Sequence, residues 1–226
     1  MKRSMRVSVI GTLLLIGLWV NTSVAMIAID YLSSLKLGQK LNCSSFSVGG
    51  DNPPNWVMVE DPGDPAKKAV LSQTNLAPSK GQFNLALTGP ELPISSGWYY
   101  SISTRIKLLG GTGASEAGIV FAAVNPNRFY ALCLDSKTNS ICLYEFFNGK
   151  QKKIATTSRK ISPQSWHELS VVIDKGKLVA SLDKQKIFSL PDKTPKGKFG
   201  LITKADSRAL FATLDFSAKD VDFGGF

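Results

Sequence analysis

Hydrophobic and polar residues alternate along most of the chain, a pattern that is typical of strands with one buried face. Between residues 99 and 109 the even-numbered positions are mainly apolar and most of the odd-numbered ones are polar. Residues 118–124 are instead almost continuously apolar, which predicts a central strand. The pattern as a whole predicts strands at 56–60, 69–73, 83–87, 99–109, 118–124, 129–134, 141–147, 153–157, 166–174, 177–182, 186–190, 197–203 and 208–216.

Turn residues separate these segments. Asn148-Gly149 is the strongest short hairpin signal, and Lys175-Gly176 marks a second turn. Strands that recur at intervals of about 8–12 residues predict an all-β sandwich or jelly roll. Residues 26–55 are irregular, and the near-helical spacing of Ile29, Leu32 and Leu35 predicts either a short helix or an extended linker.

The N-terminus has the features of a secretory leader. Lys2, Arg3 and Arg6 form a positive region, residues 7–20 are mostly apolar, and Ser-Val-Ala at 23–25 fits a cleavage site. We therefore predict export to the periplasm or the extracellular space. The alternative is an uncleaved membrane anchor, for which the apolar stretch is shorter than the ~20 residues that span a bilayer.

The predicted organisation is a signal peptide at 1–25, an N-terminal arm at 26–45, a β-sandwich at 46–220 and a tail at 221–226. The net charge is +10, and the leader contributes three positive charges and no acid, so the remainder carries 10 − 3 = +7. The lysines are scattered and not grouped in blocks, which disfavours a nucleic-acid ligand.

The cysteines are Cys43, Cys133 and Cys142. Cys133 and Cys142 flank a turn-like stretch at 135–140, so a hairpin would place them opposite each other. Two interpretations stay open: a disulfide, which an exported protein permits, or two buried thiols in adjacent strands.

Several short segments together resemble a known fold family. They are Ala-Gly-Ile-Val-Phe at 117–121, Asn-Pro-Asn-Arg-Phe-Tyr at 125–130, Leu-Asp at 134–135, Asn-Gly-Lys at 148–150, Gln-Ser-Trp-His-Glu-Leu at 164–169 and Gly-Leu-Ile-Thr-Lys-Ala-Asp-Ser at 200–207. Their order resembles the laminin G/concanavalin A-like jelly rolls of bacterial secreted proteins, which border sugar-hydrolase families of unknown function. The resemblance covers residues 46–217 and implies two stacked antiparallel sheets, one of them concave, with a groove or rim loops that often bind carbohydrate.

The catalytic signature of the glucanases in this superfamily is missing. They carry E-x-D-x-x-E on one strand, because a retaining glycosidase needs two carboxyls about 5–5.5 Å apart. This chain has no such triplet. Its only histidine, His167, follows Trp166 and is interpreted as structural, with a general base or metal ligand as the alternative. We therefore predict no catalytic residues.

The resemblance also implies a calcium ion, which takes oxygen ligands. Asp215 resembles an aspartate that often lies on the final strand of the family. Its usual partner would lie near Phe46, where this chain has no acid, and Asp51 is the replacement considered. The alternative is a solvated Asp215. Calcium is thus an optional ligand, and no cofactor is required.

The candidate ligand-binding residues are Arg105, Arg128, Tyr130 and Asp135, which the motif order places on or next to neighbouring strands. Arginine offers a planar fork for hydroxyls or carboxylates, and an aromatic face stacks on a sugar ring. Packing within the core is the alternative for the aromatic side chains. A second aromatic candidate comprises Trp98, Tyr99 and Tyr100.

Lysines gather at the predicted hairpin ends, which favours either an acidic glycan or envelope surface as ligand, or solvated tips that protect sheet edges. They are Lys150, Lys152, Lys153, Lys175, Lys177, Lys184, Lys186, Lys193, Lys196 and Lys198.

Three functions fit these features. The preferred one is an exported, non-catalytic binding module for carbohydrate or a cell-envelope polymer. The second is an assembly subunit of an extracytoplasmic protein complex, because an isolated sandwich has no obvious use for the 26–45 arm. The third is a glycoside hydrolase of uncharacterised type, against which the missing acidic triplet counts.

Overall fold

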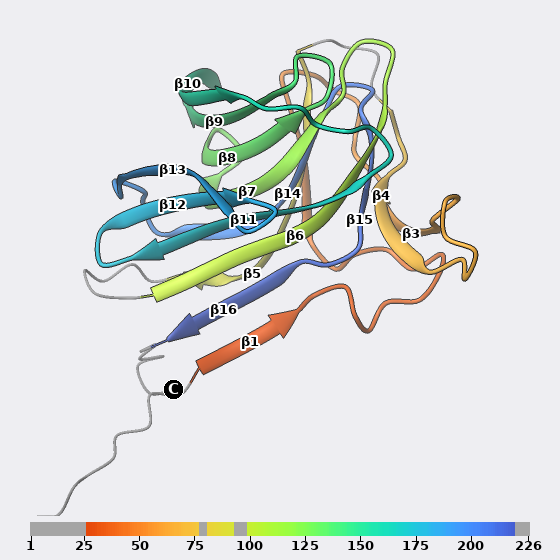
Figure 1. Cartoon of the computed structure of the whole chain (residues 1–226), viewed down its shortest axis with the longest axis horizontal. Coiled ribbons are helices and arrows are strands. Elements are labelled where there is room, and N and C mark those ends of the chain that lie inside the picture. Colours follow the sequence, from red (N-terminus) through yellow and green to blue (C-terminus); the bar gives the residue numbers. More distant parts are fainter. Residues whose placement is uncertain (1–25, 77–80, 93–98, 220–226) are drawn as a thin grey trace, which may run out of the picture.

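The computed structural model describes residues 26–76, 81–92 and 99–219, which form two stacked antiparallel sheets (Figure 1). This confirms the predicted all-β, two-sheet sandwich. Sheet A contains β1 (Met26–Asp30), β3 (Trp56–Glu60), β4 (Ala69–Gln73), β6 (Tyr99–Gly110), β11 (Trp166–Asp174), β12 (Lys177–Leu182), β13 (Gln185–Pro191), β15 (Arg208–Phe211) and β16 (Asp215–Lys219). Sheet B contains β2 (Ser44–Val48), β5 (Phe83–Leu92), β7 (Glu116–Asn125), β8 (Arg128–Asp135), β9 (Ser140–Phe147), β10 (Lys150–Ser158) and β14 (Gly197–Lys204). The predicted signal peptide, the predicted tail at 221–226 and Trp98 lie outside the described residues.

The strand order places the long strand β6 in the middle of sheet A. One edge of β6 pairs with β11, and the other pairs with β15 and then with β16. Sheet A runs β13-β12-β11-β6-β15-β4-β3, with β1 outside β16, and sheet B runs β10-β9-β8-β7-β14-β5-β2. Strands β10 and β13 are therefore edge strands of their sheets.

The segment predicted as a helix or linker instead begins with an edge strand. β1 pairs with β16, with Ile29 opposite Phe216, and Leu32 just after it is only 2% exposed. The predicted single strand at 208–216 is also two strands. Thr213 lies between these two strands and bonds to β6 through side chains. Its carbonyl accepts from Thr104 Oγ1 at 2.6 Å, and its Oγ1 accepts from Arg105 N at 3.2 Å.

The predicted hairpins at Asn148-Gly149 and Lys175-Gly176 are confirmed. The four φ angles are 50° and 71° at the first turn and 47° and 73° at the second. Two consecutive positive φ angles are the requirement of a type I′ turn, which glycine at the second position meets without steric cost.

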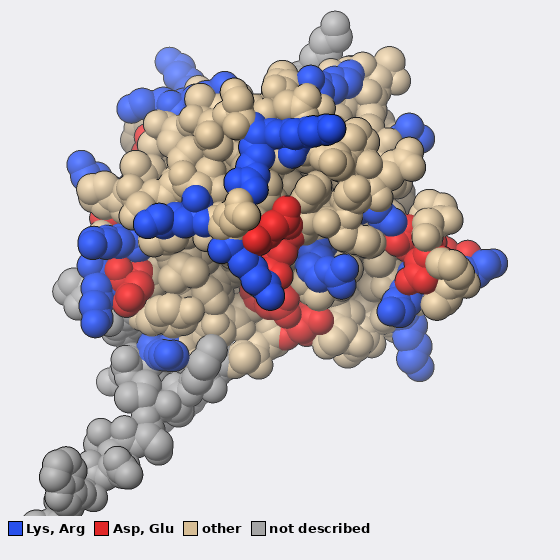
Figure 2. Space-filling model, in the orientation of Figure 1, with Lys and Arg blue, Asp and Glu red and all other residues tan. Residues whose placement is uncertain are grey.

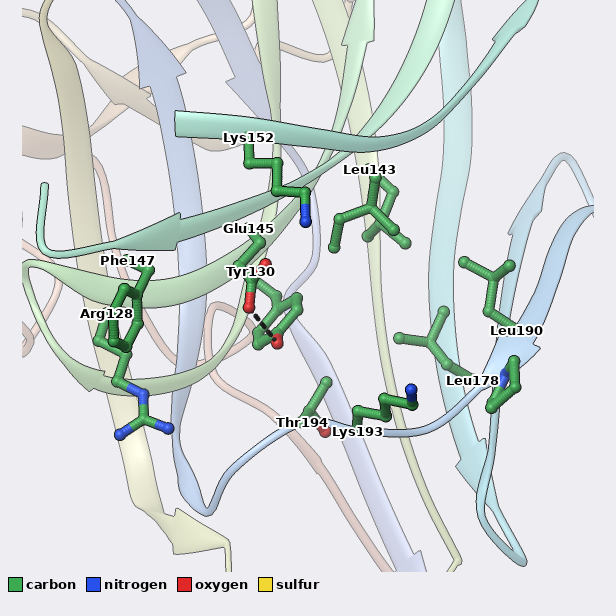
Figure 3. Close-up of a pocket in the computed structure, with 12 residues that line it drawn as sticks. Arg128, Tyr130, Leu143, Glu145, Phe147, Lys152, Leu178, Leu190, Lys193 and Thr194 are labelled. Carbon is green, nitrogen blue, oxygen red and sulfur yellow. Dashed lines mark hydrogen bonds between the residues drawn. The ribbon is translucent and has the colours of Figure 1, made fainter. Parts of the chain in front are cut away.

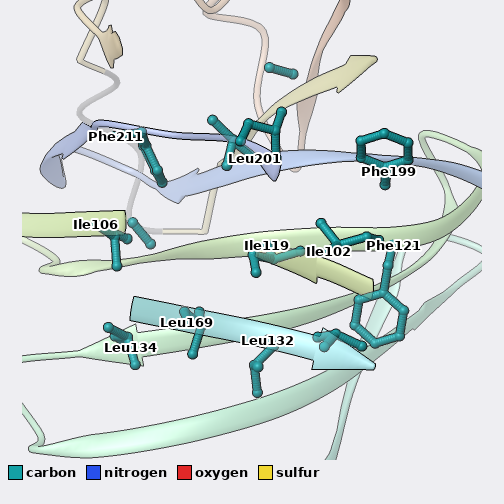
Figure 4. Packing of buried hydrophobic residues seen from close by; sticks show 14 of the residues in the cluster. Ile102, Ile106, Ile119, Phe121, Leu132, Leu134, Leu169, Phe199, Leu201 and Phe211 are labelled. Carbon is teal, nitrogen blue, oxygen red and sulfur yellow. The ribbon is translucent and has the colours of Figure 1, made fainter. Parts of the chain in front are cut away.

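The main core lies between the two sheets. Ile102 and Ile106 of β6 face the other sheet, which contributes Ile119, Phe121 and Leu132 (Figure 4). Each of these side chains is fully buried. Burial of one such side chain stabilises the fold by about 1.5–3 kcal/mol, so this layer holds the sheets together.

A second apolar cluster fills the opposite face of sheet B. Phe83 of β5 lies edge-on to Phe146 of β9 at 5.1 Å, although β14, β7 and β8 separate their strands. Four strand spacings would be about 19 Å in a flat sheet, so sheet B curls strongly towards this face. Phe129 stacks on Phe146 at 4.2 Å and is fully buried. The resemblance implies a ligand groove on the concave face. Around Phe83, Phe129 and Phe146, this face is instead packed with apolar side chains.

Candidate functional site

A cavity of about 520 Å³ opens where the edges of the two sheets meet, and we call it the inter-sheet pocket (Figure 3). Strands β8, β9 and β10 of sheet B form one wall. Strands β12 and β13 and the residues that follow β13 form the other. The described lining residues are Arg128, Tyr130, Leu143, Glu145, Phe147, Lys152, Ile154, Leu178, Leu190, Pro191, Lys193 and Thr194.

Strand register builds the polar wall of this pocket. Tyr130 of β8 lies directly opposite Glu145 of β9, and Glu145 lies directly opposite Lys152 of β10. Arg128 lies opposite Phe147 in the neighbouring row. Because side chains two residues apart share a face, these five all point towards the pocket.

Tyr130 and Glu145 are joined in the middle of the pocket. The Tyr130 hydroxyl donates to Glu145 Oε1 at 2.8 Å. Burial, followed by the Glu145 carboxylate, raises the pKa of Tyr130 to about 12. The phenol is therefore protonated at neutral pH and holds the carboxylate in one orientation.

Three cations line the same pocket. Lys152 comes from β10 and its ammonium points towards Glu145, whereas Lys193 comes from the loop after β13 and lies on the other side of Tyr130 (Figure 3). The Arg128 guanidinium lies 5.6 Å from the centre of the Phe147 ring. None of the ion pairs within the described ranges involves any of the three cations.

Apolar side chains complete the pocket. Leu143 lies on the sheet B wall, and Leu178 and Leu190 lie on the opposite wall. Phe147 is 51% exposed at the rim, unusually high for a large apolar side chain. An apolar lining with a few converging polar groups is typical of small-ligand sites, and an exposed ring beside hydrogen-bonding groups suits a sugar.

The structure brings together two of the four predicted ligand-binding residues. Arg128 and Tyr130 line the pocket together. Arg105 lies on the other sheet, on the face turned away from the core, with its guanidinium 5.5 Å from the centre of the Trp166 ring. Asp135 lies at the far end of β8, where its carboxylate accepts from Lys137 N at 2.8 Å and so caps the turn into β9.

Sequence reasoning missed Glu145 and Phe147 and considered Lys152 and Lys193 only among the lysines at hairpin ends, although the register offers a further signal. The Asn148-Gly149 turn fixes the register of β9 against β10, which aligns Glu145 with Lys152. Lys193 gave no such signal, because it reaches the pocket from the loop that follows the other sheet.

The predicted calcium residues lie on different sheets. Asp215 on β16 is opposite Asp30 of β1 in sheet A, whereas Asp51 lies in the loop after β2 of sheet B. Burial, with a smaller effect of Asp30, raises the pKa of Asp215. Among the described residues no group of three or more His, Cys, Asp or Glu side chains is arranged to hold a metal ion.

The remaining titratable candidates occupy tightly packed positions. Cys133 and Cys142 lie directly opposite each other on β8 and β9, as predicted, and both are buried free thiols. His167 Nδ1 lies 2.9 Å from Asp183 Oδ2 and so connects β11 to the turn between β12 and β13. This contact agrees with the structural interpretation of His167.

The lysines that the sequence predicted at hairpin ends are spread along the sheet edges. Lys150, Lys152 and Lys153 lie on edge strand β10, and Lys186 lies on edge strand β13. Figure 2 shows Lys and Arg side chains dispersed over one face, with a few acidic side chains near its centre. This distribution fits edge protection, and only Lys152 and Lys193 of the set line the inter-sheet pocket. Within the described ranges no helix has the length and apolarity that a membrane crossing needs.

Comparisons with known proteins show the fold. No family model matches the chain, and no curated protein does. The carbohydrate binding module CBM66 from Bacillus subtilis superposes with a TM-score of 0.55 at 19% identity, over 77% of this chain and 96% of that one. A protein of unknown function with a galectin-like fold from Bacillus subtilis gives 0.50 at 14% identity, over 78% of this chain and 90% of that one. A protein of unknown function from Shewanella oneidensis gives 0.50 at 11% identity, over 86% of each chain. The chain is thus similar in fold to galectin-like and concanavalin A-like sandwiches.

Proposed function

We propose that this protein is an exported, non-catalytic module that binds carbohydrate or a cell-envelope polymer through the inter-sheet pocket. The observation that carries the proposal is the exposed Phe147 ring at the rim of a pocket that contains the hydrogen-bonded Tyr130–Glu145 pair. A sugar offers apolar C–H faces for the ring and hydroxyls for the polar pair. The similarity in fold to a carbohydrate binding module supports the same class of ligand.

The pocket is poorly suited to glycoside hydrolysis. That reaction uses two carboxyl groups that flank the scissile bond, and Glu145 is the one carboxylate among the described residues that line the pocket. The hydroxyl of Tyr130 already occupies one of its oxygens. Binding without turnover is therefore the function that these residues support.

The assembly hypothesis loses its main support. It rested on a free arm at 26–45, but β1 pairs with β16 along its length. Of the arm leucines that suggested a partner, Leu32 is buried in the core of the same chain and Leu35 packs against it, whereas Leu37 is 54% exposed. Leu32 and Leu35 thus have a use within the domain itself. Export continues to rest on the N-terminal leader sequence.

Glycan microarray binding, followed by calorimetric titration of the best ligand, tests the proposal. We expect Phe147→Ala to weaken binding at least tenfold, because it removes the stacking surface. Leu37→Ala is the matched control, since Leu37 is 54% exposed and lies outside the pocket lining. Equal loss in both variants, or no glycan bound at all, would refute the proposal.

A further inference from the structure

The side chains that line the inter-sheet pocket carry a net positive charge. Arg128, Lys152 and Lys193 line it with one carboxylate, that of Glu145, which gives 3 − 1 = +2. Asp192 lies next to the lining, but its Oδ1 accepts from Thr194 N at 2.9 Å and from Thr194 Oγ1 at 2.7 Å. Thr194 therefore orients that carboxylate, but the carboxylate keeps its charge, so the balance with Asp192 included is 3 − 2 = +1.

The three cations are available to a ligand. All three side chains are exposed, and none takes part in an ion pair with another described residue. An anionic ligand would thus gain charge-assisted hydrogen bonds without breaking an existing ion pair. The net positive charge of the chain after its leader adds long-range attraction for such a ligand.

The single carboxylate has a different role from the cations. Tyr130 holds Glu145 Oε1, which leaves Oε2 to accept from a sugar hydroxyl. Phe147 stands at the end of the pocket where Arg128 lies (Figure 3). The pocket therefore combines one surface for a sugar ring, one acceptor for its hydroxyl and three cations, at separate places, for acidic groups.

We infer that the inter-sheet pocket selects acidic saccharides, in which a ring carries a carboxylate or sulfate group, over neutral ones. This inference rests on the proposed carbohydrate-binding function. Lys152 from sheet B, Lys193 from the loop beyond sheet A and Arg128 beside Phe147 lie at separate places around the pocket, where they attract the acidic groups of the ligand. Arginine binds planar carboxylates with two parallel hydrogen bonds, whereas lysine acts as a point charge.

Calorimetric titration with matched probes tests the selectivity. The probes are oligogalacturonate, its methyl ester, a sulfated oligosaccharide and cellohexaose. We expect one or both anionic probes to bind at least tenfold more tightly than the two neutral ones, with affinity falling as salt rises. Comparison of the carboxylate and sulfate probes then identifies which acid the pocket takes.

Charge-removing variants locate the effect. Lys152→Gln and Lys193→Gln should each weaken the better acidic probe about five- to tenfold, by a larger factor than they weaken cellohexaose. Lys153→Gln removes the same charge from the same strand outside the pocket lining, so it should change neither affinity.

The outcomes separate the two proposals. Cellohexaose that binds as tightly as both acidic probes, with binding still lost in Phe147→Ala, overturns the inference and leaves the proposed function intact. Equal losses in Lys152→Gln and Lys153→Gln also overturn it, because they indicate diffuse attraction to a basic surface. No binding of any probe or arrayed glycan refutes both proposals.

Discussion

Lys107 and Asp61 form a buried ion pair on the outer face of sheet A, with Lys107 Nζ 2.6 Å from both carboxylate oxygens. The two side chains are 6% and 3% exposed. The Trp166 ring lies 4.8 Å from the ammonium, and Gly63 N donates to Asp61 Oδ1 at 3.0 Å. This pair connects β6 to the loop that follows β3, in a position where water is largely excluded.

Removal of one partner should be far more costly than removal of both. Lys107→Met leaves the Asp61 charge buried without its counter-ion, and we expect a loss of about 3–5 kcal/mol in the free energy of unfolding. The double variant Lys107→Met/Asp61→Leu should recover most of that loss. Denaturant unfolding followed by fluorescence measures both. A double variant as unstable as the single one would contradict this account.

The same pair predicts sensitivity to acid. Burial alone would raise the pKa of Asp61, but the hydrogen bonds from Lys107 and Gly63 N outweigh it, so the pKa is lowered from 3.8. A lowered pKa in the folded state contributes stability above the unfolded value, which is lost as the pH falls through the folded value. We expect the free energy of unfolding to decrease as the pH is lowered below about 4, and to decrease less steeply in the double variant.

The Tyr130–Glu145 hydrogen bond predicts the opposite dependence at high pH. The pKa of Tyr130, about 12, lies above its ordinary value of 10.0. The contribution of the hydrogen bond to stability is therefore complete below pH 10 and is lost as the pH rises through 12. Tyr130→Phe should cost about 1–2 kcal/mol at neutral pH and should flatten the decline at high pH. Unfolding curves at several pH values measure this effect, with Tyr99→Phe as the control. An unchanged alkaline profile would refute the assignment.

Much of the fold followed from local pattern. The predicted bounds 166–174 and 177–182 coincide with β11 and β12, because alternation ends sharply at the Lys175-Gly176 turn. β1 escaped prediction for a physical reason. Its partner β16 lies almost the whole chain away, and the pairing depends on long-range contacts that no local spacing encodes.

The site was only half predictable. Arg128 and Tyr130 could be identified because they alternate on one strand next to a recognisable motif. Leu178 and Lys193 could not, since their approach to the pocket depends on how the two sheets stack and where the loop after β13 runs. The concave face illustrates the same limit: its filling by Phe83 and Phe146 requires the curl of sheet B, which the sequence does not display.

The opposed free thiols of Cys133 and Cys142 predict that oxidation joins them in a disulfide. Directly opposite residues of antiparallel strands have Cα atoms about 4.5–5.5 Å apart, within the range that a disulfide requires. Air-oxidised protein should therefore contain a Cys133–Cys142 disulfide, while Cys43 remains free to react with an alkylating agent. Mass spectrometry of protein alkylated in denaturant, before and after reduction, decides this. Reduction should lower stability by roughly 2–3 kcal/mol, and alkylation of all three cysteines in oxidised protein would exclude the disulfide.

Glycine is required at position 118, where the backbone of β8 leaves no room for a side chain on β7. A Cβ atom on Gly118 would overlap the Leu132 carbonyl oxygen and lie 2.8 Å from Cys133 Cα, so backbone atoms, not flexible side chains, would have to move. We expect Gly118→Ala to destabilise the protein by about 2 kcal/mol or more. Gly81→Ala is the matched control, because a Cβ there meets no atom within 4 Å. Thermal unfolding of the two variants measures the difference. Equal melting temperatures would show that β7 and β8 can separate without loss, which the buried aromatic cluster on this sheet makes costly.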